Sequence, residues 1–239
     1  MLTVQPLTSG LKVELGAPAP SIAPAILARV EAIWQHEKSR RGDALFNGQI
    51  FSIYQSGSNR IVGWMTEYRY FLAQQRDPAL HAELRIKPLA VTGILRCKDG
   101  VVLGRRAGQA EMDANLWELV PSGSVDDTAI DDDGQVSLER CLLTELEGET
   151  GIRAAEVSTP PKAVALVEDQ RTRVTDVCLV LGVDWSAGQI LRRFAALENR
   201  EYTGLEIISA GAIPEFRRKS AASLSEVSGA LLDSVIRWL

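Results

Sequence analysis

Histidine and cysteine are both scarce in this sequence of 239 residues. The two histidines, His36 and His81, lie in its first half, so a mechanism based on histidine is disfavoured for the rest of the chain. The three cysteines lie far apart without CxxC spacing, which excludes a zinc knuckle and gives no disulfide framework. Since all three fall in apolar runs, we expect buried free thiols at Cys97, Cys141 and Cys178.

Long basic runs and long apolar runs are also absent. The 26 Lys and Arg residues against 31 Asp and Glu residues give a net charge of -5, which argues against nucleic acid as a partner. A polyanionic substrate would therefore need local arginines or a bound metal. With no leader pattern and no segment of membrane-spanning length, we expect a cytoplasmic protein without a membrane partner.

The sequence pattern changes near Pro88. Residues 1–86 predict a small α+β extension, with helices over 25–38 and 66–75. After Pro88 the pattern predicts a domain over residues 87–239. Its predicted elements are a hairpin over 89–103, strands over 163–167, 174–183 and 205–209, and a last helix over 222–238. The sequence leaves open whether residues 1–86 fold alone or pair with a second copy in a homodimer.

The helix predicted over residues 137–150 has the clearest boundaries. Ser137 suits its N-cap and Gly151 suits the position after its end. At about 100° per residue, Glu145 and Glu149 fall on the apolar face, whereas Glu147 points away. The apolar face is formed by Leu138, Cys141, Leu142 and Leu146.

Two glutamates on an apolar face need a partner, because burying an unpaired carboxylate is costly. One interpretation is that Glu145 and Glu149 bind a cation such as a divalent metal ion. The alternative is that the helix is tilted and both glutamates reach solvent at its C-terminal end. The helix pattern by itself does not decide between them.

The segment Thr144-Glu145-Leu146-Glu147-Gly148-Glu149-Thr150-Gly151-Ile152 resembles the end of the Nudix box, G-x5-E-x7-R-E-U-x-E-E-x-G-U. The segment Trp117-Glu118-Leu119-Val120-Pro121-Ser122-Gly123 resembles the strand and glycine turn that open the box. The resemblance implies an α/β class, with a Nudix-type α/β/α sandwich and a mixed sheet. It also implies hydrolysis of a nucleoside diphosphate linked to another moiety, with Mg²⁺ or Mn²⁺ held by Glu145 and Glu149 as the catalytic and metal-binding residues.

The box departs from the family pattern at three positions. Thr144 replaces the arginine, Gly148 replaces one glutamate, and Val136 stands at the place of the first glutamate after a lengthened Asp-rich loop. These departures make the box degenerate. They leave a second hypothesis open, in which the chain is a catalytically inactive Nudix-fold module that binds a nucleotide.

Further candidates surround the box. A third metal ligand could be Glu168 or an aspartate of the loop 126–133, although a charged turn and a solvated loop explain these residues as well. Arg105 and Arg106 end a strand, so we expect one of them to face the site and contact phosphate. Trp117 is a candidate for lining a base or sugar pocket, with a buried role in the sheet as its alternative, and Gly123 for the turn beside the substrate.

The N-terminal segment carries a second, shorter resemblance. Leu45-Phe46-Asn47-Gly48 and Met65-Thr66-Glu67-Tyr68-Arg69-Tyr70-Phe71-Leu72 are similar to the extension of Nudix enzymes that hydrolyse UDP-sugars. This implies a small-molecule nucleotide sugar such as UDP-glucose as substrate. ADP-ribose or a dinucleotide would fit the box equally well, because the box handles only the diphosphate.

Overall fold

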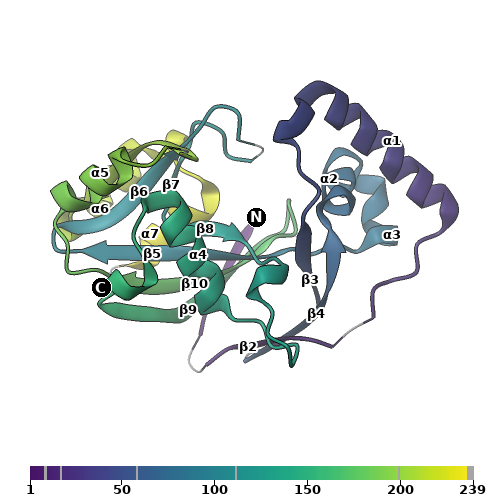
Figure 1. Cartoon of the computed structure of the whole chain (residues 1–239), viewed down its shortest axis with the longest axis horizontal. Coiled ribbons are helices and arrows are strands. Elements are labelled where there is room, and N and C mark those ends of the chain that lie inside the picture. The colour runs from purple at the N-terminus through teal and green to yellow at the C-terminus, as the bar shows by residue number, and fades with distance from the viewer. Residues whose placement is uncertain (8–9, 17, 58, 111, 199, 236–239) are drawn as a thin grey trace.

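Two β-sheets organise the chain, one in each of two lobes (Figure 1). The computed structural model describes residues 1–7, 10–16, 18–57, 59–110, 112–198 and 200–235. In this part of the chain no helix is long and apolar enough to cross a membrane.

The larger sheet has the order β1-β9-β10-β5-β6-β11, with β7 paired to β6 and β8 paired to β5. Strands β10 and β5 are parallel and the other pairings are antiparallel, so the sheet is mixed. Its strands are β1 (Leu2–Pro6), β5 (Leu89–Cys97), β6 (Gly100–Arg106), β7 (Trp117–Leu119), β8 (Ser122–Ser124), β9 (Thr159–Asp169), β10 (Thr175–Gly182) and β11 (Tyr202–Ile208).

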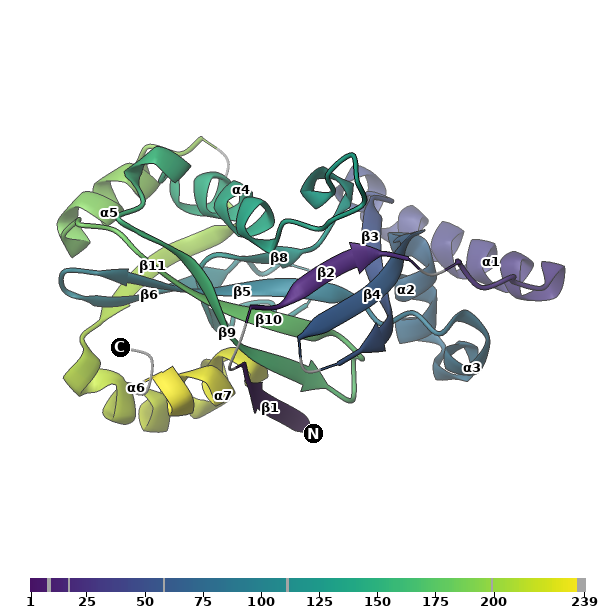
Figure 2. The same cartoon turned by 90° about the horizontal axis from the view of Figure 1, so that it is seen from below.

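Helices cover both faces of this sheet. Figure 2 shows α4 (Leu138–Thr150) and α5 (Ala187–Ala195) on one face. On the opposite face lie α6 (Ile213–Lys219) and α7 (Glu226–Val235). The predicted α/β class, with a mixed sheet between two helical layers, is confirmed. The predicted last helix is shorter at its start than expected, and residues 236–238 of that prediction lie outside the described residues.

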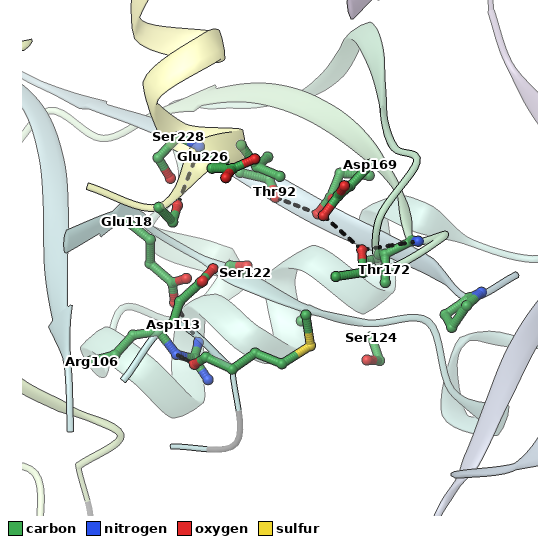
Figure 3. Close-up of a pocket in the computed structure, with 18 of the residues that line it drawn as sticks. Thr92, Arg106, Asp113, Glu118, Ser122, Ser124, Asp169, Thr172, Glu226 and Ser228 are labelled. Atoms are coloured by element: carbon green, nitrogen blue, oxygen red, sulfur yellow. Dashed lines mark hydrogen bonds and ion pairs between the residues drawn. The ribbon is translucent and has the colours of Figure 1, made fainter. Parts of the chain in front are cut away.

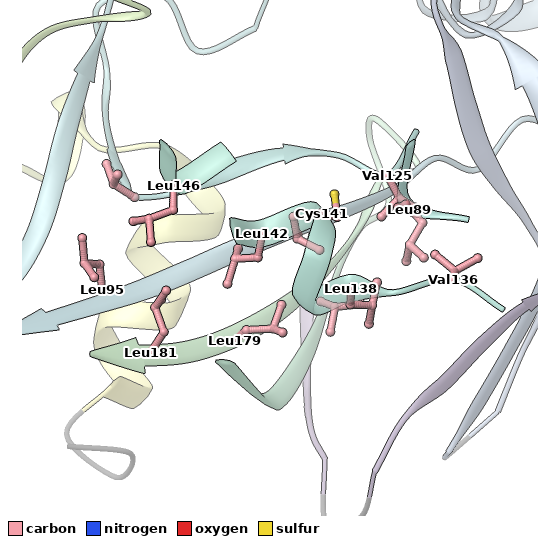
Figure 4. Packing of buried hydrophobic residues seen from close by; sticks show 14 of the residues in the cluster. Leu89, Leu95, Val125, Val136, Leu138, Cys141, Leu142, Leu146, Leu179 and Leu181 are labelled. Atoms are coloured by element: carbon pink, nitrogen blue, oxygen red, sulfur yellow. The ribbon is translucent and has the colours of Figure 1, made fainter. Parts of the chain in front are cut away.

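Helix α4 has the boundaries that its sequence predicts. The Ser137 hydroxyl accepts a hydrogen bond from the Arg140 backbone N–H at 3.2 Å, and Gly151 ends the helix in the left-handed region at φ 76°. The apolar face packs on the sheet, where Leu142 and Leu146 are fully buried beside Leu95 and Leu181 (Figure 4). Burial of each leucine stabilises the fold by about 2 kcal/mol, so the helix is fixed firmly on the sheet.

The smaller lobe contains a three-stranded sheet in the order β2-β4-β3 with three helices beside it. Its elements are β2 (Lys12–Leu15), α1 (Pro24–Arg41), β3 (Gln49–Ser56), β4 (Arg60–Glu67), α2 (Tyr68–Arg76) and α3 (His81–Leu84). Phe51 and Ile61 belong to the same buried cluster as Leu89 of the larger lobe, and β1 pairs with β9 of the large sheet. The chain before residue 87 therefore shares a hydrophobic cluster with the larger lobe and adds a strand to its sheet. The division into units 1–86 and 87–239 stays a prediction.

The cysteines are free, as the sequence predicts. Cys141 and Cys178 are buried, and burial raises the pKa of the Cys141 thiol to about 12. Cys97 is only half-buried, so the prediction of burial is wrong for this residue, which lies at the end of β5 beside the turn to β6. The two thiols in the core act as small apolar side chains.

Candidate functional site

A cavity of about 370 Å³ opens beside α4, and among the sequence candidates it is lined by Glu145, Arg106 and Gly123. Its lining comes from both lobes, since Tyr68 and Phe71 of α2 face it together with residues of the large sheet and α7. Figure 3 shows Ser228, Glu226, Thr92 and Asp169 along one wall, and Arg106, Glu118 and Asp113 at the opposite corner. The cavity is therefore strongly acidic, with Arg106 paired to Glu118 at one side and Arg171 beside Asp169 at the other.

Glu145 lines this cavity from α4. It has neither a hydrogen-bond donor nor a cation partner among the residues that the structure describes. Burial, followed by the charges of Glu201 and Asp126, raises the pKa of Glu145 to about 7. Gly123 borders the same carboxylate so closely that an added Cβ would overlap it. Gly123 is the middle residue of β8, and a larger side chain at this position would have to displace the Glu145 carboxylate.

Glu149 lies one turn further along α4 and is 2 % exposed. Burial and the neighbouring Glu201, Glu145 and Glu118 raise its pKa well above the usual value. The Ser122 backbone N–H donates to its carboxylate at 3.2 Å, and the Tyr202 hydroxyl lies 3.0 Å from Glu149 Oε1.

The Tyr202 hydroxyl connects two carboxyl groups. It lies 2.7 Å from Glu118 Oε1 as well as 3.0 Å from Glu149 Oε1, yet a phenol has one proton to donate. The second short contact requires a proton on one of the carboxyl groups. Burial raises the pKa of Glu118 too, in spite of Arg106 beside it, so Glu118, Glu149 and Tyr202 share protons within one buried group.

The two candidate arginines point in different directions, as expected for neighbours on a strand. Arg106 lines the cavity, where its Nη1 lies 2.5 Å from Glu118 Oε1 and its Nη2 lies 2.9 Å from Glu201 Oε1. Arg105 is exposed and outside the cavity lining. Arg106 is therefore the arginine that can contact a ligand, although carboxylates already neutralise it.

Besides Arg105, three predicted residues lie outside the cavity lining: Glu149, which is buried on α4, Trp117 and Glu168. Trp117 packs against the cluster between the sheet and α7, which is the structural alternative that its sequence context leaves open. Glu168 is exposed and borders a separate, smaller cavity with Thr3 and Thr175. Because successive strand residues point to opposite faces, it is Asp169, and not Glu168, that lines the main cavity.

The Asp-rich loop contributes one residue near α4. Asp126 lies close enough to raise the pKa of Glu145, and it also accepts a hydrogen bond from the Thr128 backbone N–H at 3.0 Å. Asp131, Asp132 and Asp133 border a separate shallow cavity with Arg140. Most of the loop is thus a surface feature, as its charge predicts.

Several site residues were missed by sequence reasoning. Glu118 and Asp176 stand as single charges inside apolar strands, and this pattern is the signal that could have identified them. Tyr202 carries no such signal, because an aromatic residue at the start of a strand usually serves the core. Its contacts with Glu118 and Glu149 arise only when β11 pairs with β6.

The carboxylates on α4 suit a hard divalent cation whose other ligands are water molecules and substrate oxygens. Glu145 is half-buried and Glu149 is buried, and burial together with acidic neighbours raises the pKa of both carboxyl groups. Within the described ranges, no three His, Cys, Asp or Glu side chains come together as a metal cage. Mg²⁺ is commonly held by one or two carboxylates together with waters and phosphate oxygens, so two glutamates are sufficient.

Comparison with known proteins gives matches in structure only. No protein-family profile matches the chain, and no curated protein matches its sequence. Among solved structures, it is similar to DR0079 from Deinococcus radiodurans, with 13% identity, a TM-score of 0.49 and coverage of 78% of this chain and 98% of that one. It is similar to the MutT protein from Methanosarcina mazei Go1, with 17% identity, a TM-score of 0.42 and coverage of 63% of this chain and 93% of that one. The chain is likewise similar to the Nudix domain of Shewanella oneidensis NrtR, solved with ADP ribose, with 17% identity, a TM-score of 0.42 and coverage of 66% and 96%.

Proposed function

We propose that this chain is a Nudix-type hydrolase that cleaves a nucleoside diphosphate linked to another moiety, with Mg²⁺ or Mn²⁺ as cofactor. The observation that carries the proposal is the pair Glu145 and Glu149, one helical turn apart on α4, of which Glu145 is half-buried and lines the cavity and Glu149 is buried. Two such carboxyls repel each other unless a cation or a proton lies between them. The sequence resemblance assigns metal binding to the same two residues.

The roles of the chain's own groups follow from their contacts. Glu145 and Glu149 would hold the divalent ion, which when bound polarises a diphosphate and favours deprotonation of a water. The Ser122 backbone N–H and the Tyr202 hydroxyl fix the orientation of Glu149. Arg106 would keep its ion pair with Glu118, which holds it at the cavity wall. It would exchange its second partner, the partly exposed Glu201, for a phosphate oxygen of the substrate.

For the substrate we propose a nucleotide sugar such as UDP-glucose. The short N-terminal resemblance supports this class, and Tyr68 within that segment lines the cavity. A cavity of about 370 Å³ is in the usual size range for binding a small molecule. The smaller lobe would therefore contribute to substrate selection as well as to the fold.

A second candidate function is a nucleotide-binding module without catalysis. Two observations favour it: the box positions of arginine and one glutamate are Thr144 and Gly148, and the Arg106 guanidinium is neutralised by Glu118 and Glu201. This candidate predicts that a nucleotide raises the melting temperature without being hydrolysed.

The test is phosphate release, after a coupling phosphatase, from nucleotide sugars and dinucleotides with Mg²⁺ or Mn²⁺. We expect metal-dependent turnover in the wild type and its loss in Glu145→Gln and in Glu149→Gln. Glu147→Gln is the matched control, since Glu147 is on the same helix but exposed and outside the cavity lining. Turnover that persists in both Glu145→Gln and Glu149→Gln would refute the assignment. Stabilisation by nucleotide without turnover would replace the hydrolase by the binding module.

A further inference from the structure

The part of the cavity wall formed by β10 contains a buried carboxyl group with an incomplete set of hydrogen bonds. Asp176 is 7 % exposed, and its Oδ1 accepts a hydrogen bond from the Thr92 hydroxyl at 2.8 Å. Thr92 is the one donor that contacts Asp176 within the described part of the chain. The Oδ2 atom of Asp176, a residue of the cavity lining, is therefore open to a donor from a ligand.

Two buried serines on the same cavity supply the complementary kind of group. Ser225 and Ser228 are 2 % and 1 % exposed. The Ser225 hydroxyl oxygen accepts a hydrogen bond from the Ser228 backbone N–H at 3.3 Å. The Ser228 hydroxyl oxygen accepts one from the Leu119 backbone N–H at 2.8 Å. Neither hydroxyl proton has an acceptor among the residues described. The wall thus offers two protons to donate and a carboxyl oxygen to accept.

We propose that Asp176, Ser225 and Ser228 form a subsite for the hydroxyl groups of a sugar, a subsite that selects the moiety attached to the nucleoside diphosphate. This inference rests on the proposed function, because the diphosphate would lie near Glu145 and Arg106 of the same cavity. The subsite lies on β10 and at the start of α7, outside the box helix.

The mixture of donors and acceptors selects hydroxyl groups over charged groups. A hydroxyl both donates and accepts, so a sugar can use Asp176 and the serines together. An ammonium group only donates and would leave both serine protons without acceptors. An anion only accepts, and it would face Asp176, Asp169 and Glu226, whose negative charges outnumber the single positive charge of Arg171 beside Asp169. A neutral polyhydroxyl group fits all of these side chains.

The experiment compares affinities for matched ligand pairs, UDP-glucose against UDP and ADP-ribose against ADP, by titration calorimetry without added metal at pH 8, where Asp176 is mostly ionised and accepts hydrogen bonds. In the wild type we expect tighter binding of the sugar-bearing member of at least one pair. Asp176→Asn should weaken that member about fivefold, the value of one hydrogen bond, and leave the bare diphosphate within about twofold. Ser225→Ala should act in the same direction. Asp132→Asn, which lies outside this cavity, is the control.

Several results would overturn the inference. Equal losses for both members of a pair would place Asp176 on the shared diphosphate part, and absence of any sugar preference in the wild type would remove the subsite. A loss seen only with an amino-sugar nucleotide would make the site one for a cation. Hydrolysis of dinucleotides without sugar preference rejects the subsite and keeps the hydrolase. A sugar preference that Asp176→Asn abolishes, in a protein without turnover, keeps the subsite and rejects the hydrolase.

Discussion

Replacing Asp176 by asparagine should stabilise the protein, and the gain should depend on pH. Burial raises the pKa of Asp176 from its usual 3.8 to about 7, against the opposing effect of the Thr92 hydroxyl. The folded state therefore binds the proton more tightly than the unfolded chain. Stability is lost as pH rises from about 4 to about 7, because over this window the unfolded chain releases the proton first.

The magnitude follows from the size of this pKa difference. One pKa unit corresponds to about 1.4 kcal/mol, so ionised Asp176 lowers the free energy of unfolding by on the order of 4 kcal/mol at pH 8. Asparagine keeps an acceptor for the Thr92 hydroxyl and carries no charge. We expect Asp176→Asn to raise the melting temperature by on the order of 10 °C at pH 8.

Thermal and urea unfolding at pH 5 and pH 8 give the measurement. The gain in free energy at pH 8 should be more than about twice the gain at pH 5, where the carboxyl group in the folded state is mostly protonated. Asp132→Asn serves as control, since Asp132 is exposed. An equal gain at both pH values, or a loss at pH 8, would show that burial of the charge is not what Asp176 contributes to stability.

Three further substitutions test the packing around α4. Gly148→Ala should stabilise by about 1 kcal/mol in urea unfolding without changing activity, because an added Cβ meets open space and alanine favours the helix; destabilisation would contradict this. Gly123→Ala should lower kcat/KM by about a hundredfold with little change in melting temperature, since its Cβ would displace the Glu145 carboxylate; full activity would refute the close approach. Leu146→Ala should cost about 3 kcal/mol of unfolding free energy, and a cost below about 1 kcal/mol would show that its fully buried site collapses around the smaller side chain.

Much of the fold near the site was predictable because its signals are local. The cap at Ser137, the left-handed Gly151 and the apolar face of α4 depend on neighbouring residues, and the structure has the helix over Leu138–Thr150. Helix α5 and strand β1 were missed. Strand β1 is held by pairing with β9, which is far away in the sequence, and its own residues alternate only weakly between buried and exposed.

The site was predictable for the same reason where it lies on one helix, and not where it crosses elements. Glu145 and Glu149 follow from their spacing on α4, although no observation yet tests their metal-binding role. Whether Glu168 or Asp169 faces the cavity was not predictable without the register in which β9 pairs with β1 and β10. Tyr202 reaches Glu149 only because β11 is the edge strand beside β6.

The sequence by itself determined the helix Leu138–Thr150 and the place of Glu145 and Glu149 on its inner side, because helical period and caps depend on a few adjacent residues. The α/β class followed from the family resemblance. Tertiary structure alone decided that Asp176, Ser225 and Arg106 share one cavity with Glu145. It also decided which charges lose their water and which pKa values rise. Burial is set by distant elements packing together, and no local pattern carries that information.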